Sequence, residues 1–164
     1  MDDDFQKLHP KVQAALSGGK SAYKIYDHGN FTPQIRTPLD FASALGYPTP
    51  RITKTLFLRS HDGQTHSAAV CSVDQRLDFE STADAIGAKR VKVASLDDLR
   101  SLTGYPSGGV SPLGLASGIA VVVDMQLFEY PTVLIGGGTA GIEIELSPAE
   151  LVRISGATVQ SITR

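Results

Sequence analysis

Cysteine is nearly absent from this chain, and tryptophan is absent altogether. The single cysteine, Cys71, excludes an internal disulfide and any zinc site built from several thiolates. Because Cys71 lies in the apolar run SAAVCSV, we interpret it as a buried core thiol rather than a nucleophile. The few histidines are scattered along the chain, which argues against a metal site.

Long hydrophobic runs are also missing, so no segment is expected to span a membrane. The acidic start, MDDDFQK, is unlike a secretory signal, and we therefore expect a cytoplasmic protein without a membrane partner. At 164 residues, the chain is expected to form a single domain over 1–164.

Positive and negative charges nearly balance, since the formal net charge is −2. This argues against a protein that binds nucleic acid mainly through its overall charge. A protein that binds only the end of a nucleic acid chain is compatible with this net charge. Two local clusters of basic residues fit solvated strand ends at least as well as a ligand contact. They are Lys89, Arg90 and Lys92, and Arg51, Lys54 and Arg59.

Five segments carry the marks of helices. Three of them begin with a serine or threonine that is followed three residues later by an acidic residue, at Thr37, Ser95 and Ser147. Each of these three is expected to end at a glycine, as helix C-termini often do. The expected helices are HPKVQAALSGG, LDFASALG, LDFESTADAIG, DDLRSLTG and AELVRISG.

Strand patterns fall between these helices. TKTLFLRS and THSAAVCSV predict a hairpin that turns at Asp62-Gly63, and TVLIGGG and GIEIEL predict a second one. The apolar run GIAVVVD predicts a central strand, and AYKIYDH, RVKVA and TVQSI complete the set. Because strands and helices mix without strict alternation, we predict an α/β (α+β) fold. It would be a curled, mixed, barrel-like sheet with helices around it, and not a doubly wound nucleotide fold.

The common catalytic motifs are missing. There is no P-loop and no GxSxG, and the glycines at 136–138 are followed by a strand pattern rather than a helix, which argues against a dinucleotide site. We expect no cofactor and no metal. If the protein is an enzyme, its site is short of ordinary nucleophiles and bases.

Three features remain as candidates for chemistry. Lys54 lies inside an apolar strand, where a lysine either snorkels from an edge or presents a fixed cation to a pocket. The loop TGYPSGGVSPLGL, 103–115, carries no charge. Its glycines let backbone approach a ligand, Pro112 stiffens it, and its amides can bind a carbonyl oxygen or an oxyanion. The glycines at 136–138 either open space beside a ligand or make a hairpin turn.

Together these segments resemble the YbaK family. TKTLFL, GAKRVKVAS, TGYPSGGVSPLGL, VVVD and GIEIELSPAEL occur in the order found there, and the resemblance covers residues 22–160. The family belongs to the superfamily of prolyl-tRNA synthetase-associated editing domains. The resemblance implies a curled mixed sheet wrapped by helices. It also implies a free-standing hydrolase that removes a wrong amino acid from tRNA, chiefly tRNA for proline; YbaK-type members favour cysteine and a sister group favours alanine.

The resemblance also implies site residues. Lys54 matches the family's functional lysine, and Gly108 and Pro112 match the ends of its GxxxP loop, so these three are the expected catalytic residues. Gly136 replaces a serine of the relatives, and the segment GNFTPQIRTP is longer than its counterpart. The expected substrate-binding residues are Tyr26 at the pocket mouth, Glu143 where close relatives carry aspartate, and Gly109, Ser111, Gly136 and Gly137.

The implied partner is a tRNA 3′ end that carries a small amino acid, with prolyl-tRNA synthetase or an elongation factor as a further partner. Three functions stay open at this point: a Cys-tRNA(Pro) deacylase, a deacylase for Ala-tRNA(Pro) or another small residue, and a non-catalytic module that binds tRNA ends or a synthetase. Since the chain offers no obvious base, the expected attacking group is water, or the substrate's own thiol or ribose hydroxyl.

Overall fold

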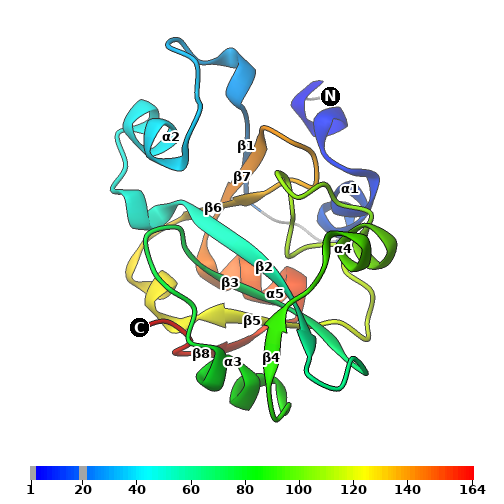
Figure 1. Ribbon diagram of the computed structural model, residues 1–164. Coiled ribbons are helices and arrows are strands. Elements are labelled where there is room, and N and C mark those ends of the chain that lie inside the picture. Colours follow the sequence, from blue (N-terminus) through cyan, green and yellow to red (C-terminus); the bar gives the residue numbers. More distant parts are fainter. Residues whose placement is uncertain (1–2, 19–21) are drawn as a thin grey trace.

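The computed structural model describes residues 3–18 and 22–164, whose strands form two hydrogen-bonded sheets (Figure 1). The first sheet is antiparallel, in the order β1-β7-β6. The second has the order β4-β2-β3-β5-β8, and β5 runs parallel to both of its neighbours. The strands are β1 (Lys24–Asp27), β2 (Thr53–Ser60), β3 (His66–Ser72), β4 (Val91–Val93), β5 (Ala120–Asp124), β6 (Val133–Gly136), β7 (Ile142–Leu146) and β8 (Thr158–Gln160).

Five α-helices surround the sheets in the five segments that predict helices, and three of them begin at the predicted caps. The hydroxyls of Thr37, Ser95 and Ser147 each accept a hydrogen bond from the amide three residues on, and the Thr37 cap is a complete capping box. Short 3₁₀ helices, which were not predicted from the sequence, join several elements. The α-helices are α1 (Pro10–Ser17), α2 (Pro38–Leu45), α3 (Phe79–Ile86), α4 (Leu96–Thr103) and α5 (Pro148–Ser155), and the 3₁₀ helices are η1 (Asp3–Lys7), η2 (His28–Asn30), η3 (Thr49–Arg51) and η4 (Met125–Glu129).

Apolar side chains pack on both faces of each sheet. The largest cluster joins residues of the two sheets with others of α1 and α5, for example Val70, Ile144, Val12 and Leu151. On the other face of the five-stranded sheet, residues of α3 contact Leu58 and neighbouring strand residues. A third cluster holds α2 against the three-stranded sheet and the start of β2. The pleat of each strand thus places alternate residues in different clusters.

The predicted curled, mixed β-structure with surrounding helices is confirmed, although the strands divide into two sheets rather than one. A parallel bridge between Ile52 and Leu134 joins these sheets just before β2 begins. Cys71 is buried as predicted, and its burial raises the pKa of the thiol to about 11. None of the helices in the described ranges reaches the length and hydrophobicity of a membrane span. No group of three or more potential metal ligands gathers among those residues.

Candidate active site

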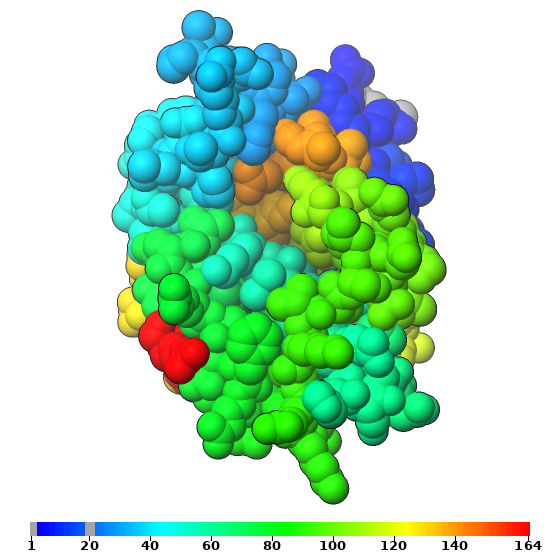
Figure 2. Space-filling model, viewed as in Figure 1, coloured from blue at the N-terminus to red at the C-terminus, as the bar shows by residue number. Residues whose placement is uncertain are grey.

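A pocket of about 490 Å³ lies where the two sheets meet. In Figure 2 the surface is hollowed between the light-blue residues near 30–40 and the yellow-green loop that follows α4, with orange residues of the β6–β7 region on the floor. Its volume lies within the ordinary range for small-molecule sites, about 300–1,000 Å³. It is lined by residues 28, 35–38, 52–56, 73, 107–110, 136 and 141–143.

Lys54 brings a cation to the wall of this pocket. It lies near the start of β2, opposite Cys71 of β3, and its side chain is half-buried. The Nζ atom donates one hydrogen bond, of 2.7 Å, to the carbonyl oxygen of Gln75. No carboxylate of the described residues lies within ion-pair distance of it. Since an ammonium carries three N–H donors, two remain for a ligand.

The loop from Ser107 to Val110 forms the facing wall, and its glycines serve different purposes. A Cβ atom added to Gly108 would meet nothing within 4 Å, so this glycine borders open space in the pocket. A Cβ atom on Gly109 would lie 2.6 Å from the backbone of Thr139. One on Gly136 would lie 2.1 Å from the carbonyl oxygen of Val110. Gly109 and Gly136 are therefore needed for close packing between the loop and the β6–β7 hairpin.

The same loop supplies amide groups. The amide of Gly109 donates to the carbonyl oxygen of Pro106 at 3.0 Å, which closes a turn. Within the described part of the chain, no acceptor occupies the amides of Ser107, Gly108 or Val110. All three residues line the pocket, so their amides are the candidates in this loop for binding a ligand oxygen.

Buried side chains hold this loop at both of its ends. The hydroxyl of Tyr105 donates a 2.5 Å hydrogen bond to the carbonyl oxygen of Leu113, and both side chains are fully buried. Ser111 is buried as well, and its hydroxyl accepts from the amide of Leu113 at 3.2 Å. The long loop carries no charge because much of it belongs to the core, where an unpaired charge would be costly.

An imidazole and a carboxylate meet on another side of the pocket. His28 lies in η2, and its Nε2 atom is 2.5 Å from Oε2 of Glu143 on β7. The His28 ring packs against the buried ring of Phe41, with 4.6 Å between centroids. His28 was not among the residues predicted for the site, although its place two residues after Tyr26 in IYDH was a usable signal.

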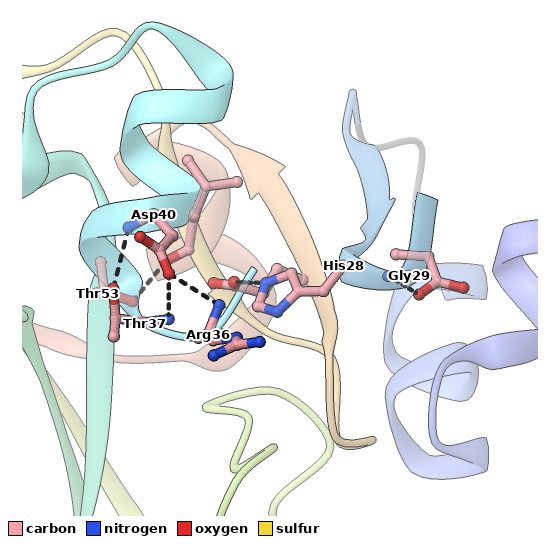
Figure 3. Close-up of polar contacts among 9 residues, drawn as sticks. His28, Gly29, Arg36, Thr37, Asp40 and Thr53 are labelled. Atoms are coloured by element: carbon pink, nitrogen blue, oxygen red, sulfur yellow. Dashed lines mark hydrogen bonds and ion pairs between the residues drawn. The ribbon is translucent and has the colours of Figure 1, made fainter. Parts of the chain in front are cut away.

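The segment before α2 contributes a second cation. Asp40 accepts hydrogen bonds from the amides of Arg36 and Thr37, at 3.0 and 3.1 Å, and so fixes the edge of the pocket (Figure 3). Arg36 itself is exposed and lines the pocket with Thr37. It belongs to GNFTPQIRTP, the segment that is longer than its family counterpart, and it too was not among the predicted site residues.

The structure brings five of the predicted site residues to this pocket and leaves four outside its lining. Those on the pocket are Lys54, Gly108, Gly109, Gly136 and Glu143. Pro112 is buried behind the loop, where it borders a different cavity. Ser111 is held inside the core, and a Cβ on Gly137 would point toward Leu8 and Ile142. The fourth is Tyr26.

Tyr26 is turned toward a buried carboxylate instead of the pocket. Its hydroxyl donates to Oε1 of Glu145 at 2.8 Å, and Tyr47 donates to Oε2 of the same group at 2.8 Å. Burial, together with the hydrogen bond to Glu145, raises the pKa of Tyr26 above its usual value. Arg51 lies 3.4 Å from Glu145 and stacks on the Tyr47 ring. Tyr26 therefore belongs to a network that joins β1 and β7 to the segment after α2.

Comparisons with known proteins agree with this architecture. The model of the aminoacyl-tRNA editing domain matches residues 32–154. A protein of Enterococcus faecalis, EbsC, is 32% identical over 123 residues, which are 74% of each chain; its name provisionally assigns it as a Cys-tRNA(Pro)/Cys-tRNA(Cys) deacylase. A proline–tRNA ligase of Pelobacter propionicus is 30% identical over 105 residues, 64% of this chain but only 18% of the ligase.

A solved structure is similar over the whole length. It is provisionally described as a trans-editing enzyme for prolyl-tRNA synthetase, and it matches 100% of this chain and 99% of its own, with a TM-score of 0.81 and 27% identity. The family model covers most of the chain and includes all the segments that line the pocket except His28. The resemblance that the sequence motifs indicated is thus confirmed, and the chain belongs to the aminoacyl-tRNA editing domain family.

Proposed function

We propose that this protein is a trans-editing deacylase that hydrolyses the ester of mischarged tRNA(Pro), with Cys-tRNA(Pro) as its preferred substrate. The observation that carries the proposal is one pocket bordered by a cation, Lys54, and by the unoccupied amides of the 107–110 loop. The similarity to EbsC supports the choice of cysteine, and the similarity to a proline–tRNA ligase supports the choice of tRNA.

Hydrolysis of an ester passes through a tetrahedral intermediate whose carbonyl oxygen becomes negative. The amides of Gly108 and Val110 are the donors we assign to this oxyanion, because they border the pocket and have no partner in the described chain. We assign the two remaining N–H donors of Lys54, beyond the one that Gln75 accepts, to the ester oxygens or the terminal phosphate. Hydrogen bonds from a charged donor are roughly twice as strong as neutral ones.

The attacking group is water or a group of the substrate itself. Addition of water to the ester carbonyl forms the tetrahedral intermediate, and its collapse breaks the bond to the ribose oxygen. That oxygen takes up a proton, and the products are a free amino acid and a tRNA with its 3′ end restored. An aminoacyl ester is already activated towards hydrolysis. The protein therefore needs only to orient the ester and to stabilise the oxyanion for the reaction to proceed.

A panel of aminoacyl-tRNAs tests the proposal. Purified protein is mixed with tRNA(Pro) that carries cysteine, alanine or proline, and loss of the ester is followed with time. We expect Cys-tRNA(Pro) to lose its amino acid fastest and Pro-tRNA(Pro) to stay intact. Faster loss of alanine would assign the protein to alanine editing, and no loss from any of the three would leave the binding module as its function.

Glu143 is expected to bind the ammonium of the aminoacyl group. Replacing it by glutamine should lower kcat/KM for Cys-tRNA(Pro) by about tenfold to a hundredfold, since a hydrogen bond to a charged group contributes about 1.5–3 kcal/mol. The effect should vanish when the substrate is N-acetyl-Cys-tRNA(Pro), because acetylation removes the positive charge. Single-turnover deacylation of both substrates measures the difference.

Glu129→Gln is the matched control for this experiment, because Glu129 is an exposed glutamate that does not line the pocket. It should hydrolyse both substrates at the rate of the unmodified protein. Equal losses of Glu143→Gln on the acetylated and the free substrate would contradict ammonium recognition. They would show instead that Glu143 acts through the geometry of its contact with His28.

A further inference from the structure

A second pocket, of about 690 Å³, lies at the opposite end of β2 from the active-site pocket. Thr53 borders the first pocket and Ser60 borders the second. The strand between them spans about 23 Å, at about 3.3 Å per residue. The walls of the second pocket are the turn between β2 and β3, the segment that follows α3, and the start of β5. None of the functions discussed above uses it.

Ser67 on β3 places an unpaired hydroxyl in the wall of this second pocket. The residue is only 2% exposed, and its Oγ atom has no hydrogen-bond partner among the described residues. Its register partners, Leu58 and Ala120, are apolar and offer no side-chain acceptor. Buried hydroxyls are nearly always paired, and because the Oγ atom itself is closed to solvent, Ser67 can take an acceptor from outside the chain only after a small shift of the pocket wall.

Two cationic side chains lie at the second pocket. Lys89 and Arg90 line the pocket, both are exposed, and neither is ion-paired with a described carboxylate. Lys89 and Arg90 also line an adjoining pocket, together with a third cation, Lys92, and one acidic residue, Glu80. In a protein whose net charge is −2, this is a local surplus of positive charge.

Among the described residues that line the second pocket, Asp62 is the one acid, and its carboxylate is already hydrogen-bonded. Asp62 accepts hydrogen bonds from the Ser60 hydroxyl at 2.6 Å and from the amide of Gln64 at 3.0 Å. The bond from Ser60, followed by that from Gln64, lowers the pKa of Asp62, so the carboxylate stays ionised within its own turn. The pocket therefore presents an ammonium, a guanidinium and a buried hydroxyl donor, a donor set that suits a phosphate.

We infer that the second pocket binds a backbone phosphate of the tRNA whose acylated 3′ end occupies the active-site pocket; this rests on the proposed function. Along β2 the nearest lining residues of the two pockets, Leu56 and Ser60, lie about 13 Å apart, so the two sites are separate and a polynucleotide can occupy both at once. Figure 2 shows the hollow of the first pocket, the green segment near residues 80–95 and the blue-green β2–β3 turn on one face, so the RNA need not wrap around the molecule. Phosphate contacts of this kind position a nucleic acid without reading its sequence.

The test is the affinity for uncharged tRNA(Pro) at several salt concentrations. The double variant Lys89→Ala/Arg90→Ala should bind about tenfold more weakly at low salt. The slope of log affinity against log salt should become shallower by about 1 for each phosphate that the variant no longer neutralises. Ser67→Ala should also weaken binding, severalfold, while its Tm stays the same or rises, because it removes an unpaired hydroxyl. Lys24→Ala/Arg164→Ala removes the same charges outside both pockets and should behave like the unmodified protein.

Hydrolysis supplies a second measurement. The KM of Lys89→Ala/Arg90→Ala should rise for Cys-tRNA(Pro) but not for a short cysteinyl ester of adenosine, which carries no phosphate for the second pocket. Affinity and salt slope equal to those of the control variant would overturn the inference. Loss of inorganic phosphate binding with unchanged tRNA binding would overturn the RNA assignment in favour of a free phosphate. Charge-dependent tRNA binding without any deacylation would contradict the proposed function and still support the second pocket.

Discussion

Replacing Lys54 by methionine is expected to reduce kcat/KM for Cys-tRNA(Pro) by about a hundredfold to a thousandfold, the usual effect of removing one donor that stabilises a transition state. Methionine keeps a flexible apolar stem of similar length, so packing along β2 is preserved and the loss isolates the charge. Single-turnover deacylation measures the effect. Lys54→Arg keeps the charge but replaces a compact ammonium by a planar fork, and we expect an intermediate rate.

The stability of these variants separates a chemical role from a structural one. Lys54 donates one hydrogen bond, to the Gln75 carbonyl oxygen, and its loss should cost about 1 kcal/mol. For a chain of this length that corresponds to a decrease in Tm of about 2–4 °C. An unchanged rate in a folded Lys54→Met protein would remove the residue from the reaction. A rate loss that only follows a much larger decrease in Tm would assign it to the fold.

Replacing Gly108 by alanine is expected to reduce the rate by about a hundredfold without affecting the fold. A Cβ atom at this position meets no protein atom within 4 Å, so the folded protein has room for it. The methyl group would instead project into space that the ester must occupy beside the loop amides. A displacement of about 1 Å of the reacting group is enough to slow catalysis a hundredfold.

Gly18→Ala is the matched control, since Gly18 lies after α1, outside the pocket lining, and a Cβ there makes only ordinary contacts of 3.8 Å. Both variants should melt within a few degrees of the unmodified protein, and only Gly108→Ala should lose deacylation. Normal turnover by Gly108→Ala would mean that the ester binds elsewhere than against this loop.

The ends of the helices were predictable because their signals are local. Thr37, Ser95 and Ser147 each act on an amide three residues away, so a short window of sequence contains the whole interaction. The division into two sheets depends on distant pairings. β1 pairs with β7, more than a hundred residues later in the chain, and nothing in either segment specifies that partner.

The candidate site was predictable for residues on strands and for Gly108 and Gly109, whose place in the pocket does not depend on the direction of a side chain. Lys54 and Glu143 lie on strands, and both reach the pocket. The direction of side chains in the irregular segments could not be predicted, because no periodicity governs them. For that reason Pro112 was placed in the site although it is buried behind the loop, and Arg36 and His28 were not selected although they line the pocket.

The hydrogen bond from the Tyr105 hydroxyl to the carbonyl oxygen of Leu113 holds the two ends of the intervening segment together and closes it into a compact loop. Its shape is set by buried groups at the base and by Val110, which packs against the core, whereas Ser107 is exposed and lines the pocket near the tip. Substitutions at the tip can therefore accumulate without disrupting the closed conformation of this loop. Under the proposed function, this gives evolution, or a designed library at position 107, a place to change which amino acid is removed while the scaffold stays the same.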